Sequence, residues 1–379
     1  MNTDVLIIGG GLAGCATAYF LAREGIDVLL VERFDLNTQA SGANAGSLHI
    51  QIPHDAFVTE GADWAREFAP TIRLMTESTK LWATIGDEID CDLEVKITGG
   101  LLVAHTQGQM RDIGRKADIE RRHGVTIELL DRNEVRELAP YISDNVIGGA
   151  FCPDEGSANP LKATPGFATA AVHHGARIMC NTEIVGLQEA GNGFVAQTTG
   201  GSISAGRIVN CGGADAGAVA AMLGLNLPVE GHPIQVSVTE PAEALVPHLV
   251  YAAAEKLTLK QMRNGTFVIG GGWPATRRSN DNALAVNLRS LRDNLRLALN
   301  VVPALADIHV VRSWPAIVNG TADWKPILGE VPGHAGFFMN MFPWMGFTAG
   351  PISALAVAEL VMGRRPSFDL DRFSAQRYA

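Results

Sequence analysis

The apolar and polar positions of the first 33 residues follow the order of one complete βαβ unit. Residues 5–8 and 28–31 are short runs of consecutive apolar residues, which is typical of strands buried on both faces. A glycine-rich turn at 9–14 and a helix over 16–24 separate them. A membrane span would also explain the apolar run 5–22, but three consecutive glycines in its middle argue against one.

Further along the chain, the pattern predicts two more groups of elements. Helical spacing marks residues 62–85, 108–123, 160–174, 287–300 and the C-terminal segment after 346. Buried or alternating runs mark strands at 176–179, 182–187, 194–198, 202–203, 207–211, 233–239, 257–261, 266–271 and 308–314. We therefore expect an α/β fold in which a Rossmann-like dinucleotide-binding domain is interleaved with a mixed-sheet substrate domain. The first domain is predicted from 1–48, 145–225 and 320–379, and the second from 49–144 and 226–319. A ligand is expected in the crevice between them.

Composition narrows the function classes. The net charge of -10 makes nucleic acid an improbable partner. The five cysteines form no CxxC pair, so the chain has no zinc or iron–sulfur signature, and we expect no metal site. An odd number of cysteines without a signal peptide indicates reduced thiols and a cytoplasmic location.

The glycine-rich turn carries a dinucleotide fingerprint. Gly9 allows the tight turn, Gly11 lets the backbone approach a pyrophosphate, and Gly14 lets helix and strand pack closely. The pyrophosphate then lies at the helix N-terminus, where free N–H groups favour an anion. Glu32, at the end of the second strand, is placed to bind a ribose diol and disfavours NADP. These residues alone leave both NAD and FAD open.

Several longer motifs resemble the D-amino-acid oxidase-like flavoproteins, which include glycine oxidase, sarcosine oxidase and D-amino-acid dehydrogenase. The motifs are the fingerprint with Glu32 and Arg33, SGANAG at 41–46, IVNCGGADA at 208–216, TADWKPILGEVPG at 321–333 and GFTAGPISALAVAELVMG at 346–363. The resemblance covers essentially the whole chain, and SGANAGSLHIQ is most similar to opine oxidase β subunits and D-hydroxyproline dehydrogenases.

The resemblance implies FAD as the cofactor and removal of a hydride from the carbon beside an amine, with flavin N5 as the acceptor. It also assigns the cofactor contacts, which are Gly9, Gly11, Gly14, Glu32, Arg33, Ser41, Asn44, Ala45, Gly46, Ser47, Val185, Gly212, Gly346, Phe347 and Thr348. No general base is required if the amine reacts in its neutral form. Candidates near the reacting atoms are His49, Gln51, Lys260 and Trp344, with Trp324 as a second wall of the site.

The chain departs from the family pattern where the substrate carboxylate is usually held. Many members carry an arginine at the position of Val318, and the usual glycine–histidine–glycine run is replaced by MFPW at 341–344. A simple amino acid in the usual pose is therefore disfavoured, and a larger secondary amine fits better. The alternative carboxylate clamps are Lys256, Lys260, Arg277, Arg278 and Lys325.

The leading hypothesis is an FAD-dependent amine dehydrogenase or oxidase that acts on an opine or an imino acid as the catalytic β subunit of a heteromer. A second, cysteine-rich subunit would then carry any iron–sulfur cluster. Two alternatives stay open. One is a stand-alone oxidase of a D-amino acid, glycine or sarcosine, and the other is a flavin-bearing subunit that has lost its chemistry.

Overall fold

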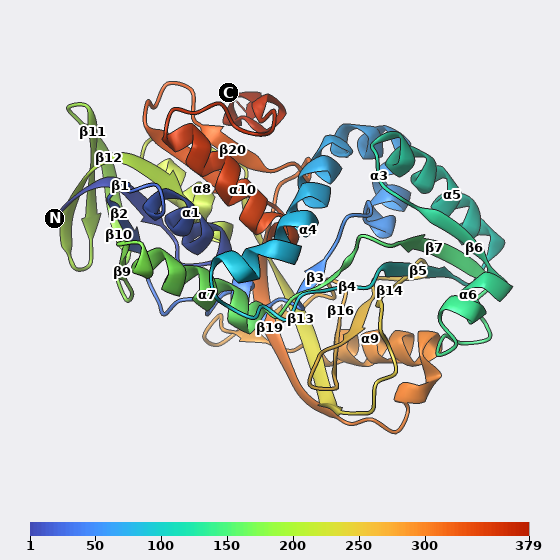
Figure 1. Ribbon diagram of the computed structural model, residues 1–379. Helices are drawn as coiled ribbons and strands as arrows, with labels where there is room; N and C mark the ends of the chain where they lie inside the picture. Colours follow the sequence, from blue (N-terminus) through green and yellow to red (C-terminus); the bar gives the residue numbers. More distant parts are fainter. Residues whose placement is uncertain (379) are drawn as a thin grey trace.

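The computed structural model describes residues 1–378. It contains two lobes, each built on one large sheet, with α4 (Pro70–Glu88) and α10 (Gly346–Val361) between them (Figure 1). The predicted βαβ unit is present at the N-terminus. The apolar run 5–22 divides into β1 (Asn2–Ile8) and α1 (Leu12–Ala22). None of the helices in the described chain has the length and apolar character that crossing a membrane requires.

The sheet of the first lobe is parallel at its centre. The strand β1 pairs in parallel with the strand on each side of it, and each of these two strands pairs in parallel with one further strand. A hairpin of two antiparallel strands extends one edge of the sheet. Its strands are β1, β2 (Val28–Val31), β9 (Arg177–Met179), β10 (Ile184–Ala190), β11 (Gly193–Thr198), β12 (Gly201–Asn210), β20 (Ile327–Glu330) and β21 (Phe337–Met341). The central strands β1 and β2 are almost fully buried because helices cover one face and β-structure and α8 (Ala216–Ala221) the other.

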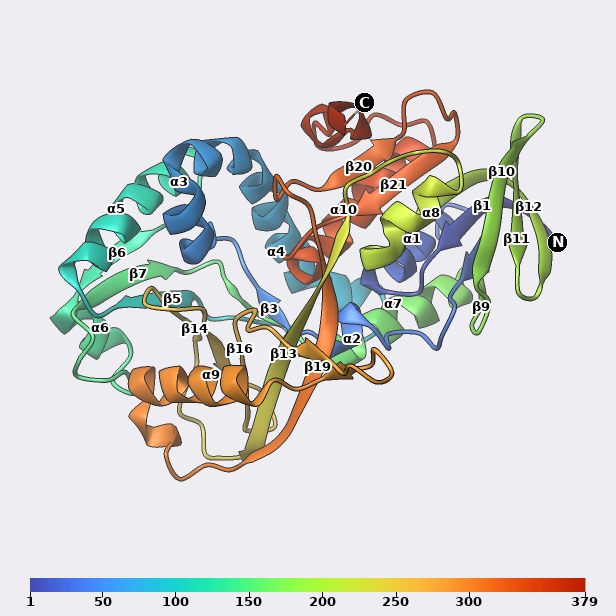
Figure 2. The same ribbon diagram turned by 180° about the vertical axis from the view of Figure 1, so that it is seen from behind.

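The sheet of the second lobe is mostly antiparallel, and β14 pairs with β5 in the parallel sense. In spatial order its strands are β19 (Val310–Gly320), β13 (Glu230–Pro241), β16 (Thr266–Gly270), β15 (Thr258–Gln261), β14 (Leu249–Ala252), β5 (Gly100–Ala104), β7 (Gly148–Cys152) and β6 (Glu128–Asp131). The long strands β13 and β19 run from this sheet toward the first lobe (Figure 2). The predicted mixed-sheet domain is therefore present.

The remaining elements cover and connect the two sheets. Helix α1 packs between α7 (Pro160–His173) and α10, and α10 packs in turn on α4. The other helices are α2 (Ala40–Ala43), α3 (His54–Phe68), α5 (Gln107–Arg122), α6 (Arg132–Leu138) and α9 (Leu288–Val301), with short 3₁₀ helices at Gly213–Asp215, Pro303–Leu305, Asp371–Phe373 and Ala375–Tyr378. Two small sheets complete the fold: β3 (Ser47–Leu48) with β8 (Gly156–Ser157) and β4 (Lys96–Ile97), and β17 (Thr276–Arg277) with β18 (Leu284–Ala285).

Two sequence predictions need correction. Residue 145 is too early as a domain boundary, because β7 pairs with β5 and β6 in the second sheet. The strand predicted at 308–314 continues to Gly320, since its pairing with β13 extends that far.

Candidate active site

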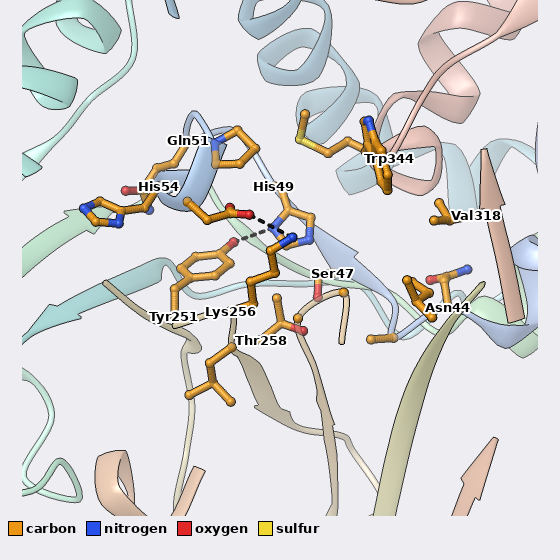
Figure 3. Close-up of a pocket in the computed structure, with 18 of the residues that line it drawn as sticks. Asn44, Ser47, His49, Gln51, His54, Tyr251, Lys256, Thr258, Val318 and Trp344 are labelled. Atoms are coloured by element: carbon orange, nitrogen blue, oxygen red, sulfur yellow. Dashed lines mark hydrogen bonds and ion pairs between the residues drawn. The ribbon is translucent and has the colours of Figure 1, made fainter. Parts of the chain in front are cut away.

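Two adjoining cavities follow the boundary between the lobes. The fingerprint cavity, of about 530 Å³, begins at the glycine turn after β1. The His49 cavity, of about 520 Å³, lies against the second sheet (Figure 3). Residues that line both cavities are Ala40, Asn44, Ile317, Val318, Trp344 and Phe347. One extended ligand can therefore reach from the fingerprint to the second lobe.

The glycine turn has the shape that a pyrophosphate needs. Gly9 has φ +111°, and a Cβ there would lie 2.5 Å from the carbonyl oxygen of Cys211. A Cβ on Gly14 would lie 1.9 Å from the Gly9 oxygen, so Gly14 lines neither cavity and instead lets α1 pack against the turn. Gly9, Gly11 and Gly212 line the fingerprint cavity. The first turn of α1 contains no acidic residue that would repel an anion there.

Glu32 and Arg33, which follow β2, also line this cavity. The Glu32 carboxylate accepts hydrogen bonds from the backbone N–H groups of Gly10 (2.7 Å) and Phe34 (2.9 Å), which fix its orientation toward the cavity it lines. Arg33 forms an ion pair with Asp215 at 2.5 Å, and both residues also line the cavity. Carboxylate oxygens at this place suit the hydroxyl groups of a ribose.

Helix α2 and the loop after it connect the two cavities. Ser41 of α2 accepts a hydrogen bond from the Leu12 N–H at 2.9 Å, which joins α2 to the first turn of α1. Asn44 lines both cavities, and Ala45 and Ser47 line the His49 cavity. Gly46 lines neither cavity. Its φ of +74° turns the chain where a Cβ would meet the Ala158 oxygen at 2.3 Å.

The N-terminus of α10 closes the boundary between the cavities. Gly346 and Phe347 line the fingerprint cavity, and Phe347 and Thr348 line the His49 cavity. The Thr348 hydroxyl accepts a hydrogen bond from the His49 N–H at 2.8 Å and donates to the Ser47 oxygen at 3.2 Å. The Thr348 carbonyl accepts hydrogen bonds from Ser78 and Trp82 of α4. Buried bonds thus hold this helix end against the loop.

The four candidates for the reacting centre occupy different positions. His49 and Trp344 line the His49 cavity, and burial together with the charge of Lys260 lowers the pKa of His49 to about 3, so the ring is neutral at pH 7. Gln51 also borders the cavity, but its amide donates to Glu155 and accepts from Lys116, so its role is structural. Lys260 lines neither cavity: it is buried and donates to Ser47 at 2.6 Å.

Of the five proposed carboxylate clamps, only Lys256 lines the His49 cavity, where it pairs with Asp55 at 3.1 Å. Arg277 borders the fingerprint cavity instead. Arg278 and Lys325 form ion pairs elsewhere with Asp281 and Glu67. The described residues around the His49 cavity include no arginine. Val318 lies in its wall, as the sequence predicts for the position where the clamp arginine is usual.

Sequence reasoning missed several residues of the site. The side chain of Val185 is 58% exposed and lines neither cavity, whereas its neighbour Ile184 lines the fingerprint cavity, so the predicted backbone contact at 184–185 stays a prediction. The missed residues Tyr251, Glu155 and Asp215 come from strands and turns that are remote in sequence. Glu155 is visible in the sequence directly before β8, but no neighbouring residue signals that its side chain is buried.

Comparison with known proteins agrees with this geometry. The family model described as "FAD dependent oxidoreductase" matches residues 4–360. The chain is 29% identical to the beta subunit of a sarcosine oxidase from Arthrobacter sp, over 87% of this chain and 79% of that protein. It is 27% identical to an opine oxidase subunit from Rhizobium meliloti, over 100% and 98%. The crystal structure of glycine oxidase from Geobacillus kaustophilus has a TM-score of 0.88 at 26% identity and covers 100% of this chain and 99% of that one.

Proposed function

The chain belongs to the family of FAD-dependent oxidoreductases, and from this premise we propose that it oxidises a secondary amine or imino acid of the opine or D-hydroxyproline type. The observation that carries the proposal is the roomy His49 cavity, which adjoins the fingerprint cavity and is walled largely by apolar residues. Bound FAD supplies the hydride acceptor for the C–H bond beside the amine. The resulting imine is then hydrolysed by water.

The residues of the fingerprint cavity hold the cofactor in this proposal. Gly9, Gly11 and Gly212 face the pyrophosphate, and Glu32 binds the ribose. The Arg33–Asp215 pair closes the adenine end of the cavity. The first turn of α10 presents its backbone N–H groups from Gly346 onward, and this helix N-terminus would stabilise negative charge on a bound flavin.

The His49 cavity favours an amine that has already lost its extra proton. Lys256 lines the cavity and opposes a second cation there, and His49 is neutral. Lys256 is the cation available to an anionic group of the substrate. Because Val318 replaces the usual clamp, that group is expected at the Lys256 side of the cavity, which suits a substrate larger than glycine.

We further propose that the chain works as the catalytic β subunit of a heteromer with a cysteine-rich, iron–sulfur partner. The similarity to two proteins that are named as subunits supports this assembly. The five cysteines of this chain are unpaired and dispersed, so an electron relay would belong to the partner. The similarity to glycine oxidase, which spans nearly the whole of both chains, favours a second candidate, the stand-alone oxidase.

Anaerobic bleaching of the flavin absorption tests the reaction. The purified holoprotein is mixed with opines, D-hydroxyproline, D-amino acids and N-methyl amino acids, and we expect secondary amines with a distal carboxylate to reduce it fastest. If no member of this panel reduces the flavin, the chain is a non-catalytic flavin subunit and the proposal is wrong. Aerobic turnover with peroxide release by the chain alone would identify the stand-alone oxidase. Turnover only after addition of a cysteine-rich partner would identify the heteromer.

A further inference from the structure

A short two-stranded ribbon continues from the second sheet toward the fingerprint cavity. After β16 the chain runs antiparallel to β13, and Ile234 pairs there with Pro274. The next N–H, that of Ala275, donates to the Pro233 carbonyl at 3.0 Å. The chain then forms β17 and β18, which pair with each other in the antiparallel sense. The β17–β18 ribbon is therefore attached to β13 of the second lobe.

The strand register places Arg277 of β17 at the level of the fingerprint cavity. Because Ala275 lies opposite Pro233 in an antiparallel pair, Arg277 lies level with Gly231. Gly231 pairs on its other side with Asn319 of β19, and all three of these residues line the fingerprint cavity. A Cβ on Gly231 would lie 3.5 Å from the Cβ of Ala214. This row of residues therefore lies beside the turn that contains Gly212.

The charged side chains around the fingerprint cavity do not by themselves suit an anion. Among the described residues they are Glu32, Arg33, Glu183, Asp215 and Arg277. Arg33 is already paired with Asp215. Without Arg277, three carboxylates would face one guanidinium, and this surplus would repel the diphosphate of FAD. The N-terminus of α1 contributes only the partial charges of its backbone N–H groups. Binding of the diphosphate therefore calls for a further cation.

Arg277 has a guanidinium that is free to supply this charge. Its Nη1 donates to the carbonyl of Asn282 at 3.0 Å, which ties the side chain to the other half of the ribbon. Within residues 1–378 no carboxylate forms an ion pair with it, and its other N–H groups have no protein acceptor. A guanidinium presents its N–H groups as a planar fork that matches two phosphate oxygens.

The neighbouring Arg278 differs from Arg277 in both direction and partner. Successive side chains of an extended segment point to opposite faces. The guanidinium of Arg278 makes two hydrogen bonds to the carboxylate of Asp281, at 3.1 Å and 2.6 Å, and the residue lines neither cavity. Two adjacent arginines of one ribbon thus have different environments, and only Arg277 faces the cofactor site.

We infer that the β17–β18 ribbon is a strap by which the second lobe holds the diphosphate of FAD, with Arg277 as the binding residue. This role differs from that of a substrate carboxylate clamp, which the sequence suggests for Arg277. It adds a residue of the second lobe to a cofactor site whose recognised contacts come from the first. The inference concerns the cofactor alone and does not depend on which amine is oxidised.

Ligand affinities of the full chain freed of FAD test this role. The probes are FAD, ADP and adenosine, because ADP keeps the diphosphate without the flavin and adenosine lacks both. In Arg277→Met we expect the dissociation constants of FAD and ADP to rise about tenfold and that of adenosine to stay unchanged. Quenching of flavin fluorescence measures FAD binding, and titration calorimetry measures the binding of the other two probes.

Arg278→Met is the matched control, since it removes the same charge from the adjacent residue. It should leave all three dissociation constants unchanged. Arg277→Lys keeps the charge but loses the fork, so its affinities for FAD and ADP should lie between those of the wild type and Arg277→Met. Equal losses in Arg277→Met and Arg278→Met would reduce the effect to the general charge of the ribbon and overturn the inference.

The choice of probes gives three further outcomes that would contradict the strap. Unchanged binding of FAD and ADP in Arg277→Met would show that the residue does not bind the cofactor. Weaker binding of adenosine as well would mean that the substitution disturbs the adenosine end or the fold. Weaker binding of FAD but not of ADP would place Arg277 at the flavin. If the affinities behave as expected but no amine bleaches the wild-type flavin, only the proposed function is wrong.

Discussion

At the scale of single residues, two tryptophans have a backbone conformation that bulky side chains rarely adopt. Trp324 and Trp344 have φ of +61° and +58°, and their rings stack at 4.9 Å beside the His49 cavity. Such a conformation costs about 1–3 kcal/mol per residue and persists where the surrounding structure enforces it, most often at functional sites. The Nε1 of Trp344 is buried without a partner in the described chain. The predicted tryptophan wall is thus present, and it is strained.

Lys260 carries a prediction of pH dependence. Burial lowers its pKa to about 7, whereas in the unfolded chain it has the ordinary value. Between these values the unfolded chain binds the proton that the folded protein has released, so the stabilisation by this group rises with pH. Relative to Lys260→Met, the free energy of unfolding of the wild type should increase by roughly 2–3 kcal/mol from pH 7 to pH 9.

The measurement is urea unfolding of both proteins at each pH. Comparison with the variant cancels the contributions of the buried thiols of Cys15 and Cys152, whose pKa burial raises in the folded protein and which in the unfolded chain titrate within this pH range. A difference between the two proteins that does not change with pH would show that Lys260 stays charged in the folded state.

At the scale of elements, α10 is joined to the loop before His49 by one hydroxyl group. Thr348 accepts from the His49 N–H and donates to the Ser47 oxygen, and all three residues belong to the wall of one cavity. Removing the hydroxyl leaves a buried N–H without an acceptor, which costs more than the bond itself contributes. The position of the N-terminus of α10, which carries the predicted cofactor contacts Gly346, Phe347 and Thr348, therefore depends on this hydroxyl group.

Replacement of Thr348 by the nearly isosteric valine should lower the free energy of unfolding by about 1–3 kcal/mol. Thr164 in α7 offers a matched control: it is also fully buried, but its hydroxyl finds no partner in the described part of the chain. Thr164→Val should therefore be neutral or stabilising. The measurement is chemical denaturation of the wild type and of the two variants. An equal decrease of the free energy of unfolding in both variants would show that the hydrogen bonds of Thr348 contribute little.

At the scale of the whole molecule, the fingerprint cavity joins the two lobes. It is lined by residues of the first sheet and also by Gly231 of β13 and Ile317, Val318 and Asn319 of β19. A ligand that fills it stabilises both lobes together, because it binds only when they are folded against each other.

We expect FAD to raise the stability of the chain by about 2.7 kcal/mol when free FAD is a hundred times its dissociation constant. Far-UV circular dichroism and tryptophan fluorescence should report one coincident thermal transition that moves upward as a unit. Two transitions, of which FAD moves only one, would mean that the lobes unfold independently and that contacts from β13 and β19 do not matter for binding.

Much of the fold could be predicted from the sequence, because its signals are local. The βαβ unit, the fingerprint glycines and Glu32 lie within 33 consecutive residues, and the dinucleotide-binding fold that they predicted is confirmed. The domain boundary that failed depends on strand pairing. The assignment of β7 to the second sheet follows from its strand partners, which are remote in sequence and which no local pattern specifies.

The sequence by itself determined the cofactor class and the end of the site that holds the cofactor tail, since a contiguous strand, turn and helix create that site wherever they fold. Only the tertiary structure decided the substrate end. His49 and Tyr251 are 202 positions apart, and Ile50 and Glu155 are 105 apart. Their hydrogen bonds exist because the segment after β3 lies against β14 and against the turn between β7 and β8. No local pattern encodes these contacts, since they form only when segments that are remote in sequence pack together.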